Sequence, residues 1–145
     1  MVNLDVKERR ILRETNTLSQ ASIREDALCA LGSTLKHLDY QFVTVTPATH
    51  SRVLARNMGR GNPLRDAFGW NHLMDPAALP REVLRLAREA SVVTTLDFGV
   101  RMNVRFATLG GELFAHSSFP TLQSDSVFFG PDTYRFVQFV RRSLP

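Results

Sequence analysis

Three helix-start signals packed into about thirty residues are the feature that most restricts how this chain can fold. In each, a polar residue directly precedes a proline: Thr46-Pro47, Asn62-Pro63 and Asp75-Pro76. The polar side chain can accept a hydrogen bond from an amide that has no partner at the helix start, and the amide that proline lacks is not needed there. The signals are too closely spaced for long helices, so the sequence predicts a series of short ones.

The ends of these helices are also marked. The first is predicted from Pro47 to about Asn57, before the break at residues 58–61. The second extends from Pro63 through Phe68 and stops at Gly69. The third follows Pro80; its apolar face is Val83, Leu84 and Ala87, with Arg81, Arg85 and Arg88 opposite.

The region before Thr46 predicts two further helices. Residues 1–18 carry many charges and few apolar residues, which indicates a short helical extension followed by a turn at 15–19. Ser22 and Glu25 have the spacing of a capping box, so a second helix is expected to begin there. Its apolar stripe is Ile23, Ala27, Leu28, Leu31, Leu35 and Leu38. Cys29 lies beside the stripe and is expected to be a buried, inert thiol.

Downstream, the pattern changes to that of strands. Residues 40–45 and 92–96 are rich in β-branched side chains, and apolar residues alternate with polar ones from Val100 to Phe106. Gly110-Gly111 marks a hairpin turn, and residues 112–116 form the returning strand. The sequence predicts an α+β fold: a mainly helical N-terminal part, a winged-helix-like unit of three helices with a small antiparallel hairpin, and a C-terminal helix.

The basic residues permit nucleic-acid binding. The net charge is +4, and of the 18 basic residues only Lys7 and Lys36 are not arginine. The candidate nucleic-acid-binding residues are Arg52, Arg56, Arg60 and Arg85. In a winged helix, Arg81, Arg88, Arg101 and Arg105 also occupy positions in the third helix and wing. The alternative is that all of these are solvated polar faces, with Arg101 and Arg105 on the exposed side of a strand.

No catalytic or metal-binding pattern is found in the sequence. His37, His50, His72 and His116 have no metal-type spacing and are expected at the surface or at helix caps. A single cysteine excludes an internal disulfide, and no glycine-rich phosphate loop or nucleophile elbow occurs. The sequence therefore predicts neither catalytic residues nor a metal site in this chain. No apolar run is long enough to span a membrane, and residues 1–10 are charged where a secretion signal is apolar, so the predicted location is cytoplasmic.

The last predicted helix is unusually apolar. It follows the turn at Gly130-Pro131, with Asp132 or Thr133 as its cap, and carries Phe136, Val137, Phe139 and Val140. One interpretation is that it docks on the core of its own domain. The other is that it is a connector whose outer face packs against a further domain.

Two segments of this region resemble a known family. Residues 116–120 (HSSFP) and 127–136 (VFFGPDTYRF) are similar to the segment that precedes the donor-binding motif in a group of bacterial class I S-adenosylmethionine-dependent methyltransferases, which carry a small-type catalytic domain. Weaker similarity covers residues 31–40, 46–56 and 64–70. The resemblance implies an N-terminal extension (1–18), a winged-helix-like accessory domain (19–126) and a connector helix (127–145) leading to a catalytic domain that is absent from the chain.

In such enzymes the turn beside the methyl-donor pocket corresponds to Pro131, Asp132, Thr133 and Tyr134, which become the candidate cofactor-binding residues. The cofactor implied is S-adenosylmethionine in the intact enzyme, and none is expected for this chain alone, because the donor loop and acceptor motif are not in it. The implied partners are the catalytic domain and an RNA or protein substrate. Two other hypotheses remain open: an independent nucleic-acid-binding winged helix, and a ligand-free interaction module that self-associates through its last helix.

Overall fold

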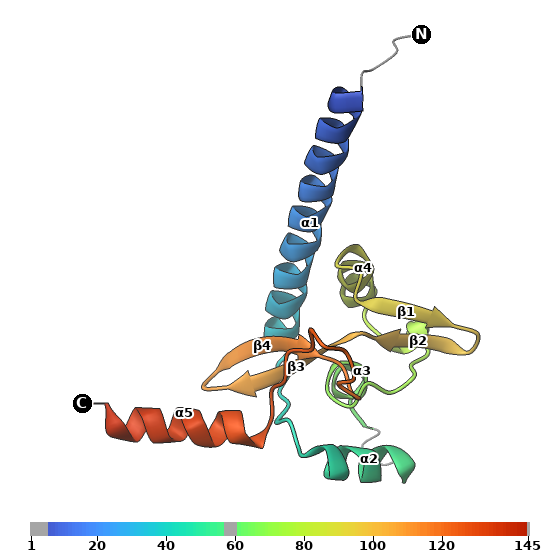
Figure 1. Cartoon of the computed structure of the whole chain (residues 1–145). Coiled ribbons are helices and arrows are strands. Elements are labelled where there is room, and N and C mark those ends of the chain that lie inside the picture. The colour runs from blue at the N-terminus through green and yellow to red at the C-terminus, as the bar shows by residue number, and fades with distance from the viewer. Residues whose placement is uncertain (1–5, 57–60, 145) are drawn as a thin grey trace.

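The computed structural model describes residues 6–56 and 61–144, apart from the side chain of Leu12. It has an α+β fold, as predicted, with helices and two small antiparallel hairpins (Figure 1). The elements are, in order, α1 (Val6–His37), α2 (Pro47–Ala55), α3 (Pro63–Phe68), the 3₁₀ helix η1 (Pro76–Ala78), α4 (Arg81–Glu89), β1 (Val93–Leu96), β2 (Gly99–Met102), β3 (Val104–Leu109), β4 (Glu112–Ser117) and α5 (Pro131–Ser143).

Helix α1 is continuous where the sequence predicts two helices. The turn expected at 15–19 and the helix start expected at Ser22 are both wrong. The polar residues of this stretch find partners along the helix itself: Arg10 pairs with Glu14 at 2.9 Å, and the Thr15 hydroxyl donates to the Ile11 carbonyl at 2.9 Å. Such local bonds let polar residues stay helical. The first half of α1 therefore extends away from the body (Figure 1).

The second half of α1 packs against α4. Ala27, Leu31 and Leu35 are buried, as the apolar stripe predicts, whereas the ends of that stripe, Ile23 and Leu38, are exposed. Cys29 is exposed, so the prediction of a buried thiol is wrong. The reason is that only a narrow face of α1 meets α4, and Cys29 lies outside it. On α4, Val83, Leu84, Leu86 and Ala87 are buried.

The three polar residue–proline signals all start helical elements, as predicted. The Thr46 hydroxyl accepts from the Thr49 amide at 3.3 Å. The Asn62 side chain accepts from two amides at the start of α3, and Asp75 accepts from the Ala77 amide at 2.9 Å to start η1. Helix α3 ends at Phe68 with Gly69 as its C-cap. The predicted break at 58–61 falls largely outside the described residues, which resume at Gly61.

The strand region forms two hairpins, not one long alternating strand. β1 pairs with β2, and β3 pairs with β4 from Val104↔Ser117 to Leu109↔Glu112. The chain bends at Asn103, between the two hairpins. Gly110 and Gly111 make the β3–β4 turn with φ of 63° and 86°, as the glycine pair predicts. The extended segment after α1 joins β3 through the Thr108 amide, which donates to the Phe42 carbonyl at 2.8 Å.

One buried side chain joins several of these elements. Asn71 follows α3 with a positive φ of 53° and is 5% exposed. Its amide nitrogen lies 3.3 Å from the carbonyl oxygens of Met102 and Val104, and its oxygen accepts from the Phe119 amide at 3.1 Å. Asn71 thus connects three parts of the fold through hydrogen bonds: the end of α3, the junction of the two hairpins, and the loop before α5.

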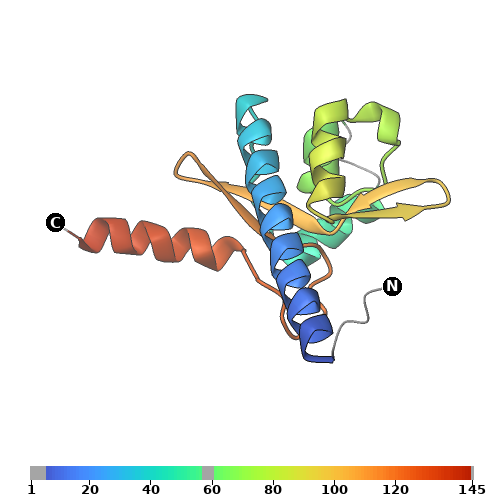
Figure 2. The ribbon, with the colours of Figure 1, turned by 90° about the horizontal axis from the view of Figure 1, so that it is seen from above.

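Among the described residues, no helix combines the length and the apolar character needed to cross a membrane. Viewed from above, α5 extends away from the rest of the molecule, on the side opposite the β1–β2 hairpin (Figure 2).

Candidate functional site

The segment that leads into α5 is anchored to the domain through aromatic contacts. Phe129 is buried and stacks on both Phe114 and His116, with ring centroids 5.4 and 5.5 Å apart. Tyr134 meets the same ring edge-on at 5.4 Å, and its hydroxyl accepts from the Thr44 amide at 3.1 Å. The start of α5 is therefore fixed against β4 and the segment that precedes α2.

The four predicted cofactor-binding residues all lie in this first turn of α5, but they face different surroundings. Tyr134 is engaged by Thr44, and the Thr133 hydroxyl accepts from the Gly130 amide at 3.4 Å. Asp132 is exposed and lies 3.5 Å from Arg135, while Pro131 is half-buried. The N-cap is Gly130, so the prediction of Asp132 or Thr133 as cap is wrong, because Pro131 already occupies the first helical position.

Beyond its first turn, α5 carries an apolar face without a cover. None of the residues 131–143, all of which the structure describes, is buried. Phe136 and Phe139 are 66% and 67% exposed, and Val137 and Val140 are half-buried. Large apolar side chains exposed together on one helix are typical of an interaction surface. Of the two interpretations of this helix, docking on the domain's own core holds for its first turn, through Tyr134, and is wrong for Phe136 and Phe139.

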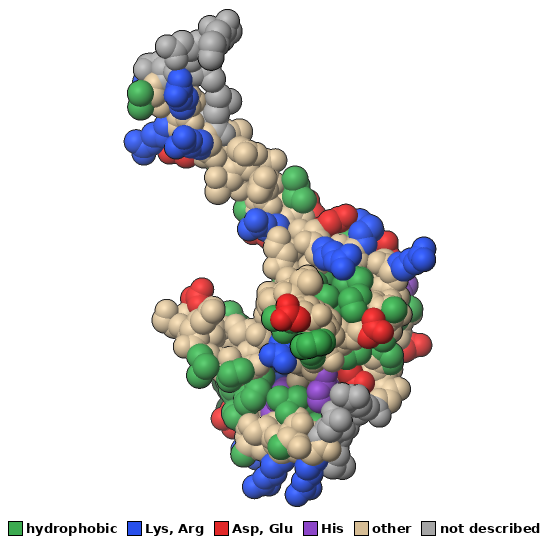
Figure 3. Space-filling model, turned by 90° about the vertical axis from the view of Figure 1, so that its right-hand side faces the viewer, with side chains coloured by type: hydrophobic (Ala, Val, Ile, Leu, Met, Phe, Trp, Pro, Cys, Tyr) green, Lys and Arg blue, Asp and Glu red, His purple; other side chains and the backbone are tan. Residues whose placement is uncertain are grey.

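Helix α2 and its C-cap carry two exposed arginines, and the helix has no acidic residue that could pair with them. Arg52 and its C-cap residue Arg56 are exposed, and the helix contains no acidic residue. Figure 3 shows the basic side chains at the lower end of the molecule, where α2 lies. Arg60, the third predicted member of this surface, lies outside the described residues.

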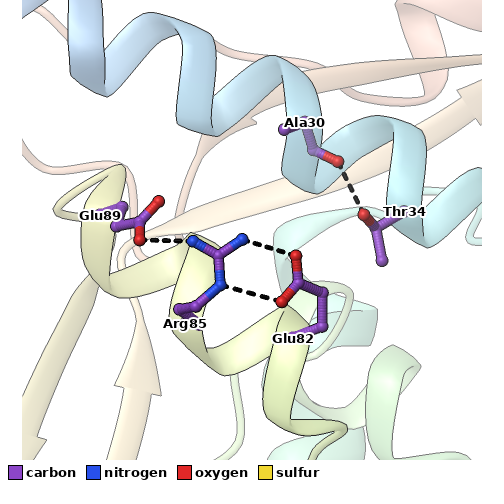
Figure 4. Close-up of polar contacts among 5 residues, drawn as sticks. All are labelled: Ala30, Thr34, Glu82, Arg85 and Glu89. Carbon is purple, nitrogen blue, oxygen red and sulfur yellow. Dashed lines mark hydrogen bonds and ion pairs between the residues drawn. The ribbon is translucent and has the colours of Figure 1, made fainter.

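Arg85, the fourth predicted nucleic-acid-binding residue, is held by two carboxylates on its own helix. Its guanidinium donates to both oxygens of Glu82 and to Glu89 (Figure 4). The carboxylates outnumber the guanidinium, so this network carries net negative charge. It lies on the α4 surface beside α1, where the Thr34 hydroxyl donates to the Ala30 carbonyl (Figure 4). The structure thus separates Arg85 from the α2 arginines.

Of the two wing arginines, Arg101 is exposed and Arg105 is not. Arg105 is only 5% exposed, and its Nε donates to the Gly69 carbonyl at 2.9 Å. Its guanidinium also lies 5.5 Å from the centre of the Phe42 ring. The prediction that Arg105 occupies the exposed side of a strand, where it could contact a nucleic acid, is wrong. The chain bends at Asn103, so β3 does not continue the alternation of β2. Side chains on both faces of β3 are buried, and Arg105 is one of them.

Two histidines, His50 and His116, are buried, whereas the sequence predicts surface or helix-cap positions for them. His50 is 1% exposed and stacks on Phe119 with ring centroids 4.3 Å apart, while its Nε2 lies 3.0 Å from the Trp70 carbonyl oxygen. His116 is 4% exposed, with Nε2 3.5 Å from the Thr44 hydroxyl. One feature of the sequence indicates that His50 is buried. Val53 and Leu54 lie three and four residues after it, so they share its face of the helix.

Burial sets the protonation of these groups. Desolvation, and second the charge of Arg105, lower the pKa values of His50 and His116 to about 4. Burial also lowers the pKa of Arg105 to about 10. At neutral pH both imidazoles are therefore neutral and the guanidinium is charged. No cluster of three or more metal-ligating side chains occurs within residues 6–56 and 61–144.

Comparisons with known proteins found no family model, no curated protein and no solved structure that matches this chain.

Proposed function

We propose that this chain is the accessory, substrate-recognition domain of a class I S-adenosylmethionine-dependent methyltransferase, without catalytic residues of its own. The observation that carries the proposal is α5, which is fixed at its first turn yet exposes Phe136 and Phe139 along its length. The resemblance of residues 116–120 and 127–136 to the segment before a methyl-donor site supports the same assignment. In this proposal the catalytic domain covers the aromatic face of α5.

In this proposal the two domains have different functions. The catalytic domain holds the donor and transfers its methyl group, and this domain presents the acceptor. Asp132 is exposed beside Arg135, 3.5 Å away, and in this proposal it meets a polar group of the donor at the domain boundary, with Pro131 beside it. Thr133 and Tyr134 act as positioning residues, because their hydroxyl groups bond within the domain.

The first test is assembly with a catalytic domain. A purified small-type catalytic domain from the bacterial group that the sequence resembles is mixed with this chain, and the mass of the complex is measured by analytical ultracentrifugation. We expect a one-to-one complex that is lost in the double variant Phe136→Glu/Phe139→Glu. The matched control is Leu122→Glu, which changes a residue that is 83% exposed on another segment. A complex that survives the double variant, or the absence of any complex, would contradict the proposal.

A second test concerns the donor. Calorimetric titration of S-adenosylmethionine into this chain alone is expected to give no heat of binding, because the proposal places the pocket in the catalytic domain. Saturable binding by the chain alone would mean that it forms its own donor site, and the division of labour would be wrong.

A nucleic-acid acceptor is favoured by α2. Arg52 and Arg56 are exposed on a helix without acidic residues, so they can contact phosphates. We expect fluorescence anisotropy to show binding of a labelled RNA hairpin, with an affinity that falls as salt rises. The variant Arg52→Ala/Arg56→Ala should reduce the salt slope by about two. Arg24→Ala, which changes an exposed arginine of α1, is the matched control, and equal slopes for the α2 variant and wild type would remove this surface from the proposal.

Two alternatives are separated by the same experiments. Salt-dependent RNA binding without any complex with a catalytic domain would favour an independent nucleic-acid-binding module. Self-association of the chain, lost in Phe136→Glu/Phe139→Glu, would favour an interaction module. A cytoplasmic location is part of the proposal, because the free thiol of Cys29 is exposed and suits a reducing compartment.

A further inference from the structure

The most unusual group in the interior is a guanidinium without a counter-charge. Arg105 is 95% buried, yet it forms no ion pair with any residue in the described ranges. Its Nε is satisfied by the Gly69 carbonyl, but one terminal nitrogen, Nη2, is buried with no hydrogen-bond partner among the described residues. An unpaired buried charge is costly, so such a site favours an anion.

The groups around Arg105 do not neutralise it. Four titratable side chains interact electrostatically with Arg105. They are the phenols of Tyr40 and Tyr134 and the imidazoles of His50 and His116. Burial raises the pKa of Tyr40 far above its ordinary value, so this phenol stays neutral. The imidazoles are neutral at pH 7 for the same reason, which leaves Arg105 as the charged member of the cluster.

A small pocket meets this cluster. Arg105, His116 and Thr44 line its buried end, and Pro47, Thr121 and Phe128 lie at its exposed end. Ser117 also lines it; its oxygen accepts from the Val127 amide at 2.8 Å, which leaves the hydroxyl proton free to donate. The free space is enough for about one water-sized atom.

We propose that this pocket binds a compact monovalent anion, either a halide or a single carboxylate oxygen, between the Arg105 guanidinium and the hydroxyl groups of Thr44 and Ser117. The guanidinium supplies the charge, and the two hydroxyl groups, which also line the pocket, supply donors. The size of the free space excludes tetrahedral oxyanions such as sulfate unless the loop at residues 118–130 moves. This proposal is independent of the methyltransferase assignment.

The occupied pocket would also stabilise that loop. Phe119, Thr121, Phe128 and Phe129 line the pocket from the loop, whereas Thr44 and Arg105 line it from the segment after α1 and from β3. An anion therefore bridges two parts of the fold that are distant in sequence. Binding is expected to raise the thermal stability of the whole domain.

The experiment is thermal unfolding of the whole chain in graded sodium chloride, bromide, formate, acetate and sulfate, at an ionic strength held constant with methanesulfonate, which carries no carboxylate group. We expect a saturable rise in Tm with the compact anions, of about 9 °C at a hundredfold excess over Kd. Arg105→Gln should lose the saturable rise, and Arg101→Gln, which changes an exposed arginine of β2, should keep it. If Arg105→Gln does not fold, Ser117→Ala takes its place and should weaken the apparent affinity several-fold.

The outcomes separate the sources of the anion. A saturable rise with chloride and bromide as well as formate identifies a free compact ion. A rise with formate and acetate alone identifies the carboxylate group of a larger ligand. Only non-saturable changes, a saturable effect confined to sulfate, or equal responses of wild type and Arg105→Gln would overturn the proposal. Anomalous scattering from a bromide-soaked crystal provides the direct check, with a peak expected beside Arg105 and Thr44.

Discussion

Lowering the pH from 7 to 4 is expected to destabilise this domain strongly, because two imidazoles are buried in neutral form. The Nε2 of His50 lies 3.0 Å from the Trp70 carbonyl oxygen, so Nε2 carries the proton, and the buried Nδ1 has no partner among the described residues. A second proton on this ring would place a buried N–H with nothing to accept it. His116 lies near the charge of Arg105, which opposes its protonation as well.

The magnitude follows from the two pKa values. In the folded chain the pKa of each imidazole is about 4, compared with 6.5 when unperturbed. Between these pH values the unfolded chain binds protons that the folded chain does not. The stability is therefore fully present above pH 6.5 and falls as the pH drops toward 4. Each histidine accounts for about 3 kcal/mol, against a total of about 5–15 kcal/mol for a typical domain.

The assay is urea denaturation followed by far-UV circular dichroism at pH values from 4 to 7.5. The free energy of unfolding should fall by up to about 2.7 kcal/mol per pH unit where both histidines contribute. His50→Gln should halve this slope, because the glutamine amide can still donate to the Trp70 carbonyl but does not titrate. His37→Gln, on the exposed surface of α1, is the control. Identical slopes for wild type and His50→Gln would refute the reasoning.

Three further predictions concern the free energy of unfolding, measured by urea denaturation at pH 7. Leu31→Ala should cost about 3 kcal/mol, because Leu31 is fully buried against α4; a loss under about 1 kcal/mol would contradict the α1–α4 packing. Asn71→Ala should cost about 3 kcal/mol, because it leaves the Phe119 amide without its side-chain acceptor and removes the contacts with two hairpin carbonyls. Gly99→Ala should cost more than about 2 kcal/mol, because φ is 154° and the new Cβ would collide with the Met74 carbonyl oxygen. Gly111→Ala, which meets no atom within 4 Å, should cost less, and equal losses would argue against the collision.

The parts of the fold that the sequence predicts correctly are those with local causes. Thr46, Asn62 and Asp75 cap helices through amides two or three residues away, so their pattern in the sequence is sufficient. The glycine turn between β3 and β4 is equally local. The capping-box pattern at Ser22 failed because the preceding residues are already helical, and a cap acts only where a helix begins.

The candidate site could be predicted only in part, because its contacts join residues far apart in the sequence. His50 is buried by Phe119, and Tyr134 is held by Thr44, which lies 90 residues earlier. Neither pairing leaves a periodic signal. The apolar character of α5 is plain in the sequence, but composition alone left open whether its aromatic face docks on the domain's own core or is exposed, and the structure shows Phe136 and Phe139 exposed. The buried state of Arg105 was not, because it depends on the bend at Asn103.

The length of α1 has a mechanical consequence. With a rise of about 1.5 Å per residue, the exposed stretch from Val6 to Asp26 places its tip about 30 Å from the point where α1 meets α4. A rigid rod of this length acts as a lever, so a rotation of about 10° at the α4 contact would sweep its far end through about 5 Å.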